Sequence, residues 1–384
     1  METTPAFRGL TCTACGETYP AEEGRCPACD APLDPTYDYD AVPEFADGDG
    51  SMWRFGPLLP FADPVSAAEG GTPLVDAPGL AEELGAGRVR LKDEGRNPTG
   101  SFVDRGMALA VTAAADAGTE PLALAAAGDA GQSAAAYAGR VDLRAYAFVP
   151  SRAPFANKAM VNVHGAEMRV SGGRYPDALA ALGEDLAADH YSLQEFTSPY
   201  RHEGAKTVAY EVAAERGWTA PDAVVVPVGT GELLVGVEKG FRELGELGLI
   251  DATPRLVAAQ PEGCAPVVEA FESGSEAPAP PEYPDTICGE LEIPDPAGGR
   301  LALRALARAD GEAVAVPDDD ALEAAVATTK TTTVEVGTAG GVAAAAAWAL
   351  ADTVGADDEV VVVNPATGLK TPDVLRSHLM GQGV

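Results

Sequence analysis

Short apolar runs alternate with alanine-rich segments along most of the chain, and this alternation constrains the fold more than any other feature. Strands that alternate with helices predict an α/β fold with parallel sheets and right-handed crossover connections. The runs with the length and composition of buried strands are 122–127, 145–150, 223–228, 256–259 and 360–363. The segments that favour helices are 106–117, 133–140, 204–216 and 339–353.

Length and charge narrow the class of protein. At about 150 residues per domain, 384 residues indicate two or three domains. Lys and Arg number 26 and Asp and Glu number 59, so the formal net charge is 26 − 59 = −33. A general nucleic-acid binder needs clustered cations, and this balance argues against one. The sequence contains no apolar run of 18 residues and no basic start followed by an apolar run. We therefore expect no membrane span, no secretory signal and a cytoplasmic location.

The acidic residues are spread over the whole chain, and only six residues are lysine. A fold with this much like charge repels itself in dilute salt, whereas molar salt shortens the screening length to about 3 Å. We interpret the charge as adaptation to a salty, halophilic cytoplasm. The alternative is an acidic surface that binds a partner, but single-sign charge blocks, which are typical of interaction tails, are absent.

Four of the six cysteines lie in one short segment with the spacing of paired metal-binding turns. Cys12 and Cys15 form one Cys-x2-Cys turn, and Cys26 and Cys29 form the second. This spacing predicts a zinc ribbon over residues 1–36, with free thiols as the less favoured alternative. Because all four ligands are cysteine, no position is left for water, and the zinc is expected to be structural. The two remaining cysteines, at positions 264 and 288, are expected to be buried packing residues.

An acidic segment with Pro and Tyr residues follows the ribbon, and we interpret residues 37–75 as a linker or arm. Residues 76–384 contain the alternating strands and helices. Within them, residues 272–283 are rich in Pro, Glu, Ser and Ala and predict a surface loop. The four histidines are scattered along the chain without a Ser or Cys partner, so we expect packing or surface roles for them.

Four sequence words carry a resemblance to a known family. They read LKDEGRNPTGSFVDRGM at 91–107, EGAKTVAYE at 203–211, PVGTGELLVGVEKGF at 227–241 and RLVAAQPEGCAP at 255–266. With the leading zinc ribbon, the chain closely resembles archaeal and bacterial threonine synthases, which are fold-type II pyridoxal-phosphate (PLP) enzymes. The resemblance implies an α/β fold of the tryptophan synthase β type. That fold has two lobes of parallel sheets with a cleft between them, and its smaller lobe would cover roughly residues 105–205. It also implies a homodimer.

In that family PLP is held by a Schiff-base lysine, an asparagine facing the ring phenolate, a glycine-rich phosphate turn and a hydroxyl at the pyridine nitrogen. This chain departs from the pattern at each of these groups. Val103 stands at the lysine position and has no amine. Asp129 replaces the asparagine, and Pro365 stands where the hydroxyl belongs. The phosphate turn is Gly229, Thr230 and Gly231, followed by Glu232 and Leu233 in place of a glycine and an asparagine.

These changes lie on separate segments but all concern one cofactor. They favour a threonine synthase-like pseudoenzyme without an expected catalytic residue, for which PLP is doubtful. Such a relative would bind a metabolite or act as a regulatory paralogue. The alternative is an active lyase that converts O-phosphohomoserine to threonine and phosphate through a displaced lysine such as Lys92.

The Asn97–Ser101 loop keeps the family residues, and so does position 133. Asn97, Thr99, Ser101 and Ser133 therefore form the predicted substrate pocket, which could take a small anionic amino-acid-like ligand. The competing interpretation is that these residues serve the turn and the following helix. As partners we expect such a ligand and a second copy or a paralogue of the chain, but no nucleic acid and no membrane.

Overall fold

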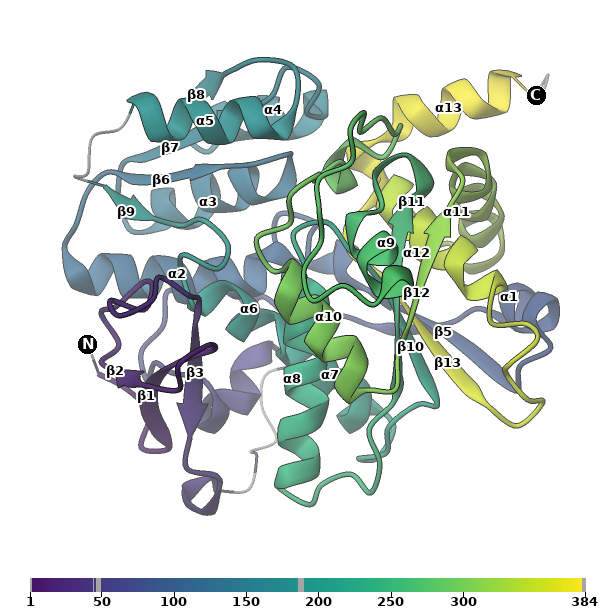
Figure 1. The fold of residues 1–384 in the computed structure, drawn as a ribbon, viewed down its shortest axis with the longest axis horizontal. Coiled ribbons are helices and arrows are strands. Elements are labelled where there is room, and N and C mark those ends of the chain that lie inside the picture. Colours follow the sequence, from purple (N-terminus) through teal and green to yellow (C-terminus); the bar gives the residue numbers. More distant parts are fainter. Residues whose placement is uncertain (1, 44, 46–49, 186–189, 382–384) are drawn as a thin grey trace. The chain divides into compact units, whose positions relative to one another are not determined.

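The computed structural model describes residues 2–43, 45, 50–185 and 190–381, which divide into two compact units (Figure 1). The first unit comprises Met1–Gly71 and Val103–Thr207, and the second comprises Thr72–Phe102 and Val208–Val384. Each unit has a sheet of its own with helices packed on it. None of the helices in the described part of the chain combines the length and the apolar character that a bilayer span requires.

The first unit is built on a four-stranded parallel sheet in the order β8-β7-β6-β9. Its strands are β6 (Leu122–Ala125), β7 (Ala145–Val149), β8 (Glu167–Val170) and β9 (Tyr191–Ser192). Its helices are α2 (Val103–Ala117), α3 (Asp129–Arg140), α4 (Phe155–Val163), α5 (Tyr175–Asp185) and α6 (Tyr200–Ala205). Figure 1 shows α3 and α5 on opposite sides of this sheet. From β6 to β8 the chain moves across the sheet in one direction, and after β8 it returns to β9. Because both crossovers are right-handed, the helix of the returning connection, α5, lies on the opposite face from α3.

Two glycines allow α2 and α6 of the first unit to touch. A Cβ atom on Gly106 would lie 2.2 Å from the carbonyl oxygen of Arg201, and one on Gly204 would lie 2.2 Å from the carbonyl oxygen of Arg105. No larger residue fits at either position without moving a backbone. The close approach of the two helices therefore requires glycine at both positions.

A small antiparallel sheet precedes the four-stranded one, in the order β2-β1-β3. It consists of β1 (Phe7–Cys12), β2 (Thr18–Tyr19) and β3 (Leu33–Tyr37). After it, the segment predicted as an arm contains the 3-10 helices Tyr39–Ala41 and Met52–Leu58, and the second of these buries Met52, Phe55 and Leu58. Residues 44 and 46–49 of that arm lie outside the described residues.

The second unit is built on a six-stranded sheet in the order β12-β11-β10-β13-β5-β4. Within this sheet, as far as the structure describes it, only β4 at the edge runs antiparallel to its neighbour. The strands are β4 (Leu74–Asp76), β5 (Arg88–Asp93), β10 (Ala223–Pro227), β11 (Arg255–Pro261), β12 (Glu312–Val316) and β13 (Glu359–Asn364). The central strands are buried along nearly their whole length, as expected for parallel strands covered on both faces.

Helices pack on both faces of the six-stranded sheet. The helices of this unit are α1 (Pro78–Leu84), α7 (Thr207–Glu215), α8 (Glu232–Glu246), α9 (Pro266–Ser273), α10 (Gly299–Arg308), α11 (Asp318–Thr332), α12 (Thr338–Trp348) and α13 (Pro372–Gly381), of which α13 packs on α11. Helix α12 packs across β10, β11, β12 and β13, and its alanine-rich sequence is buried on all sides. The apolar core around it includes Val225, Val257, Val342 and Val362.

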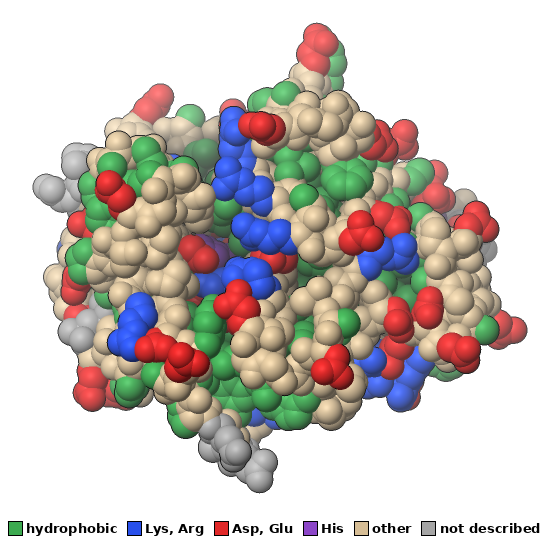
Figure 2. Space-filling model, turned by 60° about the horizontal axis from the view of Figure 1, so that its bottom comes forward, with side chains coloured by type: hydrophobic (Ala, Val, Ile, Leu, Met, Phe, Trp, Pro, Cys, Tyr) green, Lys and Arg blue, Asp and Glu red, His purple; other side chains and the backbone are tan. Residues whose placement is uncertain are grey.

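The predicted elements are present with small shifts at their ends. Each of the five predicted strands overlaps an observed one, and the predicted helices 106–117, 133–140 and 339–353 correspond to α2, α3 and α12. Segment 204–216 comprises the last two residues of α6 and, after an interruption at Lys206, helix α7, so it is helical but is not one helix. The predicted loop 272–283 is mainly exposed coil, but its first two residues complete α9. Figure 2 shows acidic side chains scattered over the visible face instead of gathered in one block.

Candidate functional site

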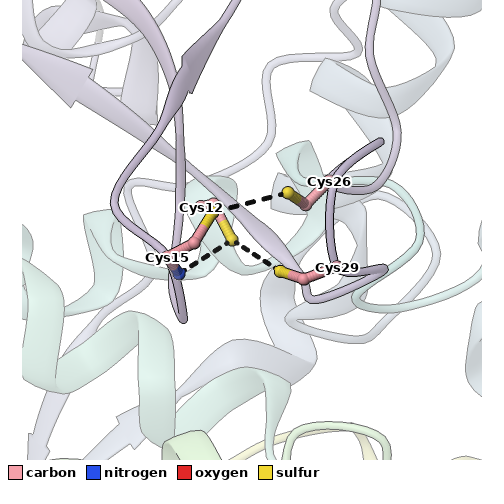
Figure 3. Close-up of side chains that lie close together, drawn as sticks. All are labelled: Cys12, Cys15, Cys26 and Cys29. Atoms are coloured by element: carbon pink, nitrogen blue, oxygen red, sulfur yellow. Dashed lines mark hydrogen bonds between the residues drawn. The ribbon is translucent and has the colours of Figure 1, made fainter.

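The four cysteines of the N-terminal segment converge at the end of strand β1 (Figure 3). Their Sγ atoms all lie within 4.8 Å of one another. The Sγ atom of Cys12 is 3.5 Å from that of Cys29, and the Sγ atom of Cys15 is 3.7 Å from that of Cys26. A tetrahedral ion with sulfur ligands at about 2.3 Å places them about 3.8 Å apart. The cluster therefore fits one metal ion without a change of fold.

Hydrogen-bond donors around the sulfur atoms of Cys12 and Cys26 favour the thiolate form, which is the form that binds metals. At Cys15 and Cys29 backbone N–H groups act in the same direction, but contacts with the neighbouring thiols outweigh them and raise the pKa. The backbone N–H groups of Ala14 and Cys15 each lie 3.4 Å from the Sγ atom of Cys12. The hydroxyl of Tyr19 lies 3.4 Å from the Sγ atom of Cys26. Burial opposes ionisation of the Cys26 thiol, but the hydrogen bonds from Tyr19 and from backbone N–H groups outweigh it and lower the pKa of Cys26 to about 6.

Strand β3 connects the cysteine cluster to helix α6 within the first unit. The hydroxyl of Tyr37, the last residue of β3, donates a hydrogen bond of 2.5 Å to the buried carboxylate of Glu203. The same carboxylate forms an ion pair with Lys206, whose Nζ atom lies 4.1 Å from the centre of the Tyr37 ring. The hydroxyl of Tyr200 also donates to the carbonyl oxygen of Ala21. The ribbon is thus fixed to the unit by buried polar contacts.

Position 103 lies at the start of α2, where the side chain of Val103 is buried. The next residue, Asp104, accepts a hydrogen bond of 2.6 Å from the hydroxyl of Ser133, and both side chains are fully buried. Ser133 was predicted to line a substrate pocket. In the structure its hydroxyl donates a hydrogen bond to Asp104 within the first unit.

Asp129 is the first residue of α3, so its carboxylate lies at the positive end of the helix dipole. The side-chain amide of Asn157, on α4, donates 2.8 Å to the Oδ1 atom of Asp129 and 3.2 Å to the Oε1 atom of Gln132. A neutral amide and a helix N-terminus both stabilise a charged carboxylate at this position. Sequence reasoning did not identify Asn157, because it lies 28 residues from its partner.

The 97–101 loop belongs to the second unit and follows the carboxyl end of β5. The amide of Asn97 donates to the backbone oxygen of Glu94 at 2.9 Å and to its carboxylate at 2.8 Å. The hydroxyl of Thr72 donates to the other carboxylate oxygen of Glu94 at 2.5 Å. Asn97 therefore shapes the loop through Glu94, a buried acid that the sequence analysis had not singled out.

The 97–101 loop runs beside the segment that follows strand β13, so the predicted substrate loop lies next to the segment that contains Pro365. The N–H of Thr367 donates to the carbonyl oxygen of Gly100, and the N–H of Phe102 donates to that of Pro365, both at 2.9 Å. Gly100 has a φ of 77°, and a Cβ atom there would lie 2.8 Å from the Cγ2 atom of Thr367. Thr99 and Ser101 are buried in this packing. Pro365 thus lies beside the predicted substrate loop.

The turn 229–231 connects β10 to α8 in the same unit. Gly231 adopts a φ of 93° and directly precedes Glu232, the first residue of α8, whose side chain is buried. The N–H of Gly298 donates 2.9 Å to the carbonyl oxygen of Thr230. A Cβ atom on Gly229 would lie 3.4 Å from the backbone oxygen of Glu290. The turn is therefore closely covered by residues 290–298.

The sequence analysis missed two polar clusters: the buried pair of Asp93 and Asn364, and the half-buried Glu290. The amide of Asn364 donates 2.9 Å to the carboxylate of Asp93, which joins the carboxyl ends of β13 and β5. Among the described residues the Oδ1 atom of Asn364 has no hydrogen-bond partner. Glu290 accepts hydrogen bonds from the hydroxyl of Thr338 and, at 3.2 Å, from the N–H of Ala339 at the start of α12. The adjacency of parallel strand ends could have pointed to Asp93 and Asn364.

Comparison with known proteins gives the family of the chain. The model of a family described as pyridoxal-phosphate dependent enzymes matches residues 65–366. The chain belongs to this PLP-dependent family. Its relatives include threonine synthases: that of Methanosarcina acetivorans is 33% identical over 376 residues, which cover 95% of this chain and 93% of that protein. The threonine synthase of Synechocystis is 34% identical over 345 residues, covering 87% of each chain.

Solved structures of the PLP-dependent family share the fold. An L-serine ammonia-lyase from Rhizomucor miehei matches with a TM-score of 0.70 and 21% identity, over 83% of this chain and 99% of that chain. Threonine deaminase isoform 2 from Solanum lycopersicum matches with a TM-score of 0.68 and 20% identity, over 82% of this chain and 88% of that chain. The fold-type II architecture predicted from the sequence is confirmed.

The lysines of this PLP-family chain are held in different ways. The Nζ atom of Lys92 forms a fully buried ion pair with Glu211 at 2.7 Å and donates to the backbone oxygen of Thr72. Lys206 is buried against Glu203 and the Tyr37 ring, and Lys239 is buried 4.0 Å from Glu243. The remaining three are less buried: Lys158, Lys330 and Lys370. The Cε atom of Lys370 lies 3.5 Å from where a Cβ atom on Gly100 would stand, so this lysine packs on the 97–101 loop.

Proposed function

We propose that this chain is a threonine synthase-like protein with a degenerate PLP site, which binds a small anionic amino-acid-like metabolite and acts as a regulatory relative. The observation that carries the proposal is the residue at the start of α2. Val103 is aliphatic and buried where the threonine synthase pattern has the Schiff-base lysine. A valine side chain contains no nucleophile, and no change of pKa or rotamer supplies one.

The competing function is an active lyase that eliminates phosphate from O-phosphohomoserine and adds water, using a displaced lysine. Lys92 was the leading candidate for that lysine. Its ammonium group is fully buried in an ion pair with Glu211. Withdrawing it to attack an aldehyde would leave a buried carboxylate without its partner, which costs about 3–5 kcal/mol. The ion pair therefore supports the non-catalytic function.

The charge of the remaining positions also supports the proposal. Asp129 would place a carboxylate where the family has a neutral asparagine, facing the ring phenolate. Glu232 adds a second carboxylate at the end of the glycine turn. At about 5 Å, a carboxylate and a doubly charged phosphate repel each other by about 7 kcal/mol at an effective dielectric constant near 20. The residues of this chain therefore do not fit a covalently held PLP.

Spectroscopy of the full chain tests the proposal. The protein is purified in molar KCl with added PLP, its visible absorbance is recorded, and it is reduced with borohydride before peptide mapping. We expect no lysine to carry a reduced PLP adduct. An adduct on Lys92 or any other lysine, or release of phosphate from O-phosphohomoserine, would contradict the proposal. In the Val103→Lys variant, absence of an adduct would show that Asp129 and Glu232 also exclude the cofactor, and Val103→Leu is the matched control.

The ligand and the metal have separate tests. The proposed metabolite is sought by the shift of the thermal midpoint with O-phosphohomoserine, homoserine and threonine, because a ligand that binds only the folded state raises it. We further propose that the four cysteines hold a structural zinc ion, since the geometry fits a tetrahedral ion and leaves no ligand position for water. The chain is proposed to work in the cytoplasm, as a homodimer or with a paralogue.

A further inference from the structure

A cavity of about 220 Å³ lies on the second unit, against helices α8 and α10, which Figure 1 shows side by side. It is away from the glycine turn, since its residues come from the later part of α8, the last residues of α10 and the start of β11. The cavity is lined by Glu238, Phe241, Arg242, Thr253, Pro254, Leu256, Arg308 and Ala309. None of these residues belongs to the predicted cofactor or substrate positions.

The polar residues of the cavity form a cationic group around one acid. The side chain of Glu238 is only 7% exposed and is approached by two guanidinium groups. The Nε atom of Arg242 donates to its Oε1 atom at 3.1 Å, and the Nη1 atom of Arg308 donates to its Oε2 atom at 3.3 Å. Among the eight lining residues the formal charge is 2 − 1 = +1. The Nη1 atom of Arg242 also lies 3.8 Å from the Oε1 atom of Glu246, which is outside the lining, so its charge is shared between two carboxylates.

The remaining wall is apolar. Phe241 and Leu256 are almost fully buried, so the faces that they present to the cavity are rigid parts of the core. Pro254 is also buried and fixes the backbone at the start of β11. The lining therefore combines forked hydrogen-bond donors with hydrocarbon.

We propose that this cavity is a binding site for a small aliphatic carboxylate. Guanidinium groups bind carboxylates through two parallel hydrogen bonds, and the site has two such groups with one acid between them. Arg308 is half-exposed, with 54% of its side chain accessible, so it can turn from Glu238 to a ligand at little cost. The hydrocarbon part of the ligand would lie on Phe241 and Leu256.

The size of the cavity limits the ligand. Drug-sized ligands occupy pockets of about 300–1,000 Å³, and this cavity has about 220 Å³. It is suited to a molecule with the bulk of an aliphatic amino acid or oxo acid, not to a nucleotide. An amino acid would add an ammonium group for Glu238, whereas a simple acid would use only the arginines. The amino acid and the simple acid share the carboxylate and the apolar chain.

Calorimetric titration of the full chain in 1 M KCl tests the site with three probes: 4-methylpentanoate, its neutral amide and L-leucine. We expect 4-methylpentanoate to bind and the amide to bind at least 10-fold more weakly. Arg308→Ala should weaken binding at least 10-fold. Arg304→Ala is the matched control, because Arg304 lies one helical turn earlier on α10, is exposed and does not line the cavity. It should change the affinity less than 2-fold.

The outcomes separate the possibilities. Tighter binding of L-leucine than of 4-methylpentanoate identifies an amino-acid ligand with its ammonium on Glu238, and weaker binding identifies a simple acid. The proposal is overturned if neither acid binds at 10 mM, if the amide binds as tightly as the acid, or if Arg304→Ala weakens binding as much as Arg308→Ala. Thermal unfolding of each variant, recorded without ligand, checks that the exposed substitutions leave the fold intact.

Discussion

Lys92 and Glu211 form an ion pair in which the Nζ and Oε2 atoms are 2.7 Å apart and neither side chain is exposed. Strand β5 carries the lysine and helix α7 carries the glutamate, so the pair ties two distant segments of the second unit together. The backbone oxygen of Thr72 accepts a further hydrogen bond from the same ammonium group. Lys92 therefore has a structural role that accounts for its presence without any chemistry.

Removing one partner of this pair should be strongly destabilising. Lys92→Met leaves the Glu211 carboxylate buried and uncompensated, and we expect the free energy of unfolding to fall by about 3–5 kcal/mol. The double variant with Glu211→Leu should recover part of that loss. Lys330→Met, at an exposed position on α11, is the control and should change stability by less than about 0.5 kcal/mol. Urea unfolding is measured for these variants, for the Glu211→Leu single variant and for the unsubstituted protein, and an additive double variant would show that the two residues are not coupled.

The cysteine cluster should bind one metal ion per chain. Cys15→Ser removes one of four ligands, so we expect loss of the metal, measured by elemental analysis, and a lower thermal midpoint. Cys264→Ala changes a buried cysteine outside the cluster and should keep the full metal content. Equal metal content in the two variants would contradict the assignment.

The contact between α2 and α6 should not tolerate a methyl group. Gly106→Ala would place a Cβ atom 2.2 Å from the backbone oxygen of Arg201, so one helix must shift, and we expect a loss of about 3 kcal/mol. At Gly245 on α8 nothing lies within 4 Å of a Cβ atom. Gly245→Ala should therefore stabilise by about 0.5–1 kcal/mol through helix propensity. Chemical denaturation should show a lower free energy of unfolding for Gly106→Ala and a higher one for Gly245→Ala.

One carboxylate in the first unit should make stability depend on pH. The backbone N–H groups of Arg174 and Gly173 donate to Asp177 near the start of α5 and hold the pKa of Asp177 below its usual value. Because the folded-state pKa is the lower one, this carboxylate stabilises the fold above its unfolded pKa, and the contribution is lost as pH falls through the folded pKa.

Asp177→Asn should therefore lower the unfolding free energy at pH 7, by no more than about 0.5 kcal/mol because the carboxylate is exposed to solvent. The difference from the unsubstituted protein should shrink steadily below pH 4. Glu184→Gln, at an exposed position of the same helix, is the comparison. A difference that stays constant from pH 7 to pH 3.5 would rule out the ionic contribution.

Salt should stabilise the protein through its charge. The Debye length falls from about 10 Å at 0.1 M to about 3 Å at 1 M, which screens repulsion among surplus carboxylates. With a net charge of −33, we expect the thermal midpoint to rise between 0.1 M and 2 M KCl. The rise should be smaller at pH 4, where part of the carboxylates are neutral, and a rise independent of pH would point to a cause other than charge.

The fold could be predicted from the sequence where the signal is local. The paired spacing of Cys12 with Cys15 and Cys26 with Cys29 is set by single turns, and the structure brings the four sulfur atoms together. The buried parallel strands are recognisable because each is a continuous apolar run, as in β10 and β13. Short strands such as β2 and β9 escaped because two residues carry no periodicity.

The residues of the candidate site could be identified from the sequence, but their neighbours in the fold could not. The residues at positions 103, 129 and 232 were identified from sequence words alone. Their surroundings depend on residues far along the chain, such as Asn157 beside Asp129. Lys92 shows the limit most clearly: its position in the sequence suggested a spare amine, and its partner Glu211 lies 119 residues later. The cationic cavity was invisible for the same reason, since Arg308 and Glu238 lie 70 residues apart.

The bond between Tyr37 and Glu203 has a consequence beyond the ribbon itself. Tyr37 ends β3, which pairs with β1, the strand that ends at Cys12, and Glu203 also pairs with buried Lys206. If the proposed ion holds this sheet together, a chain without it would leave the Glu203–Lys206 pair without the hydrogen bond from Tyr37. Degradation in the cell acts on molecules that open, so the amount of this protein should follow the supply of the metal.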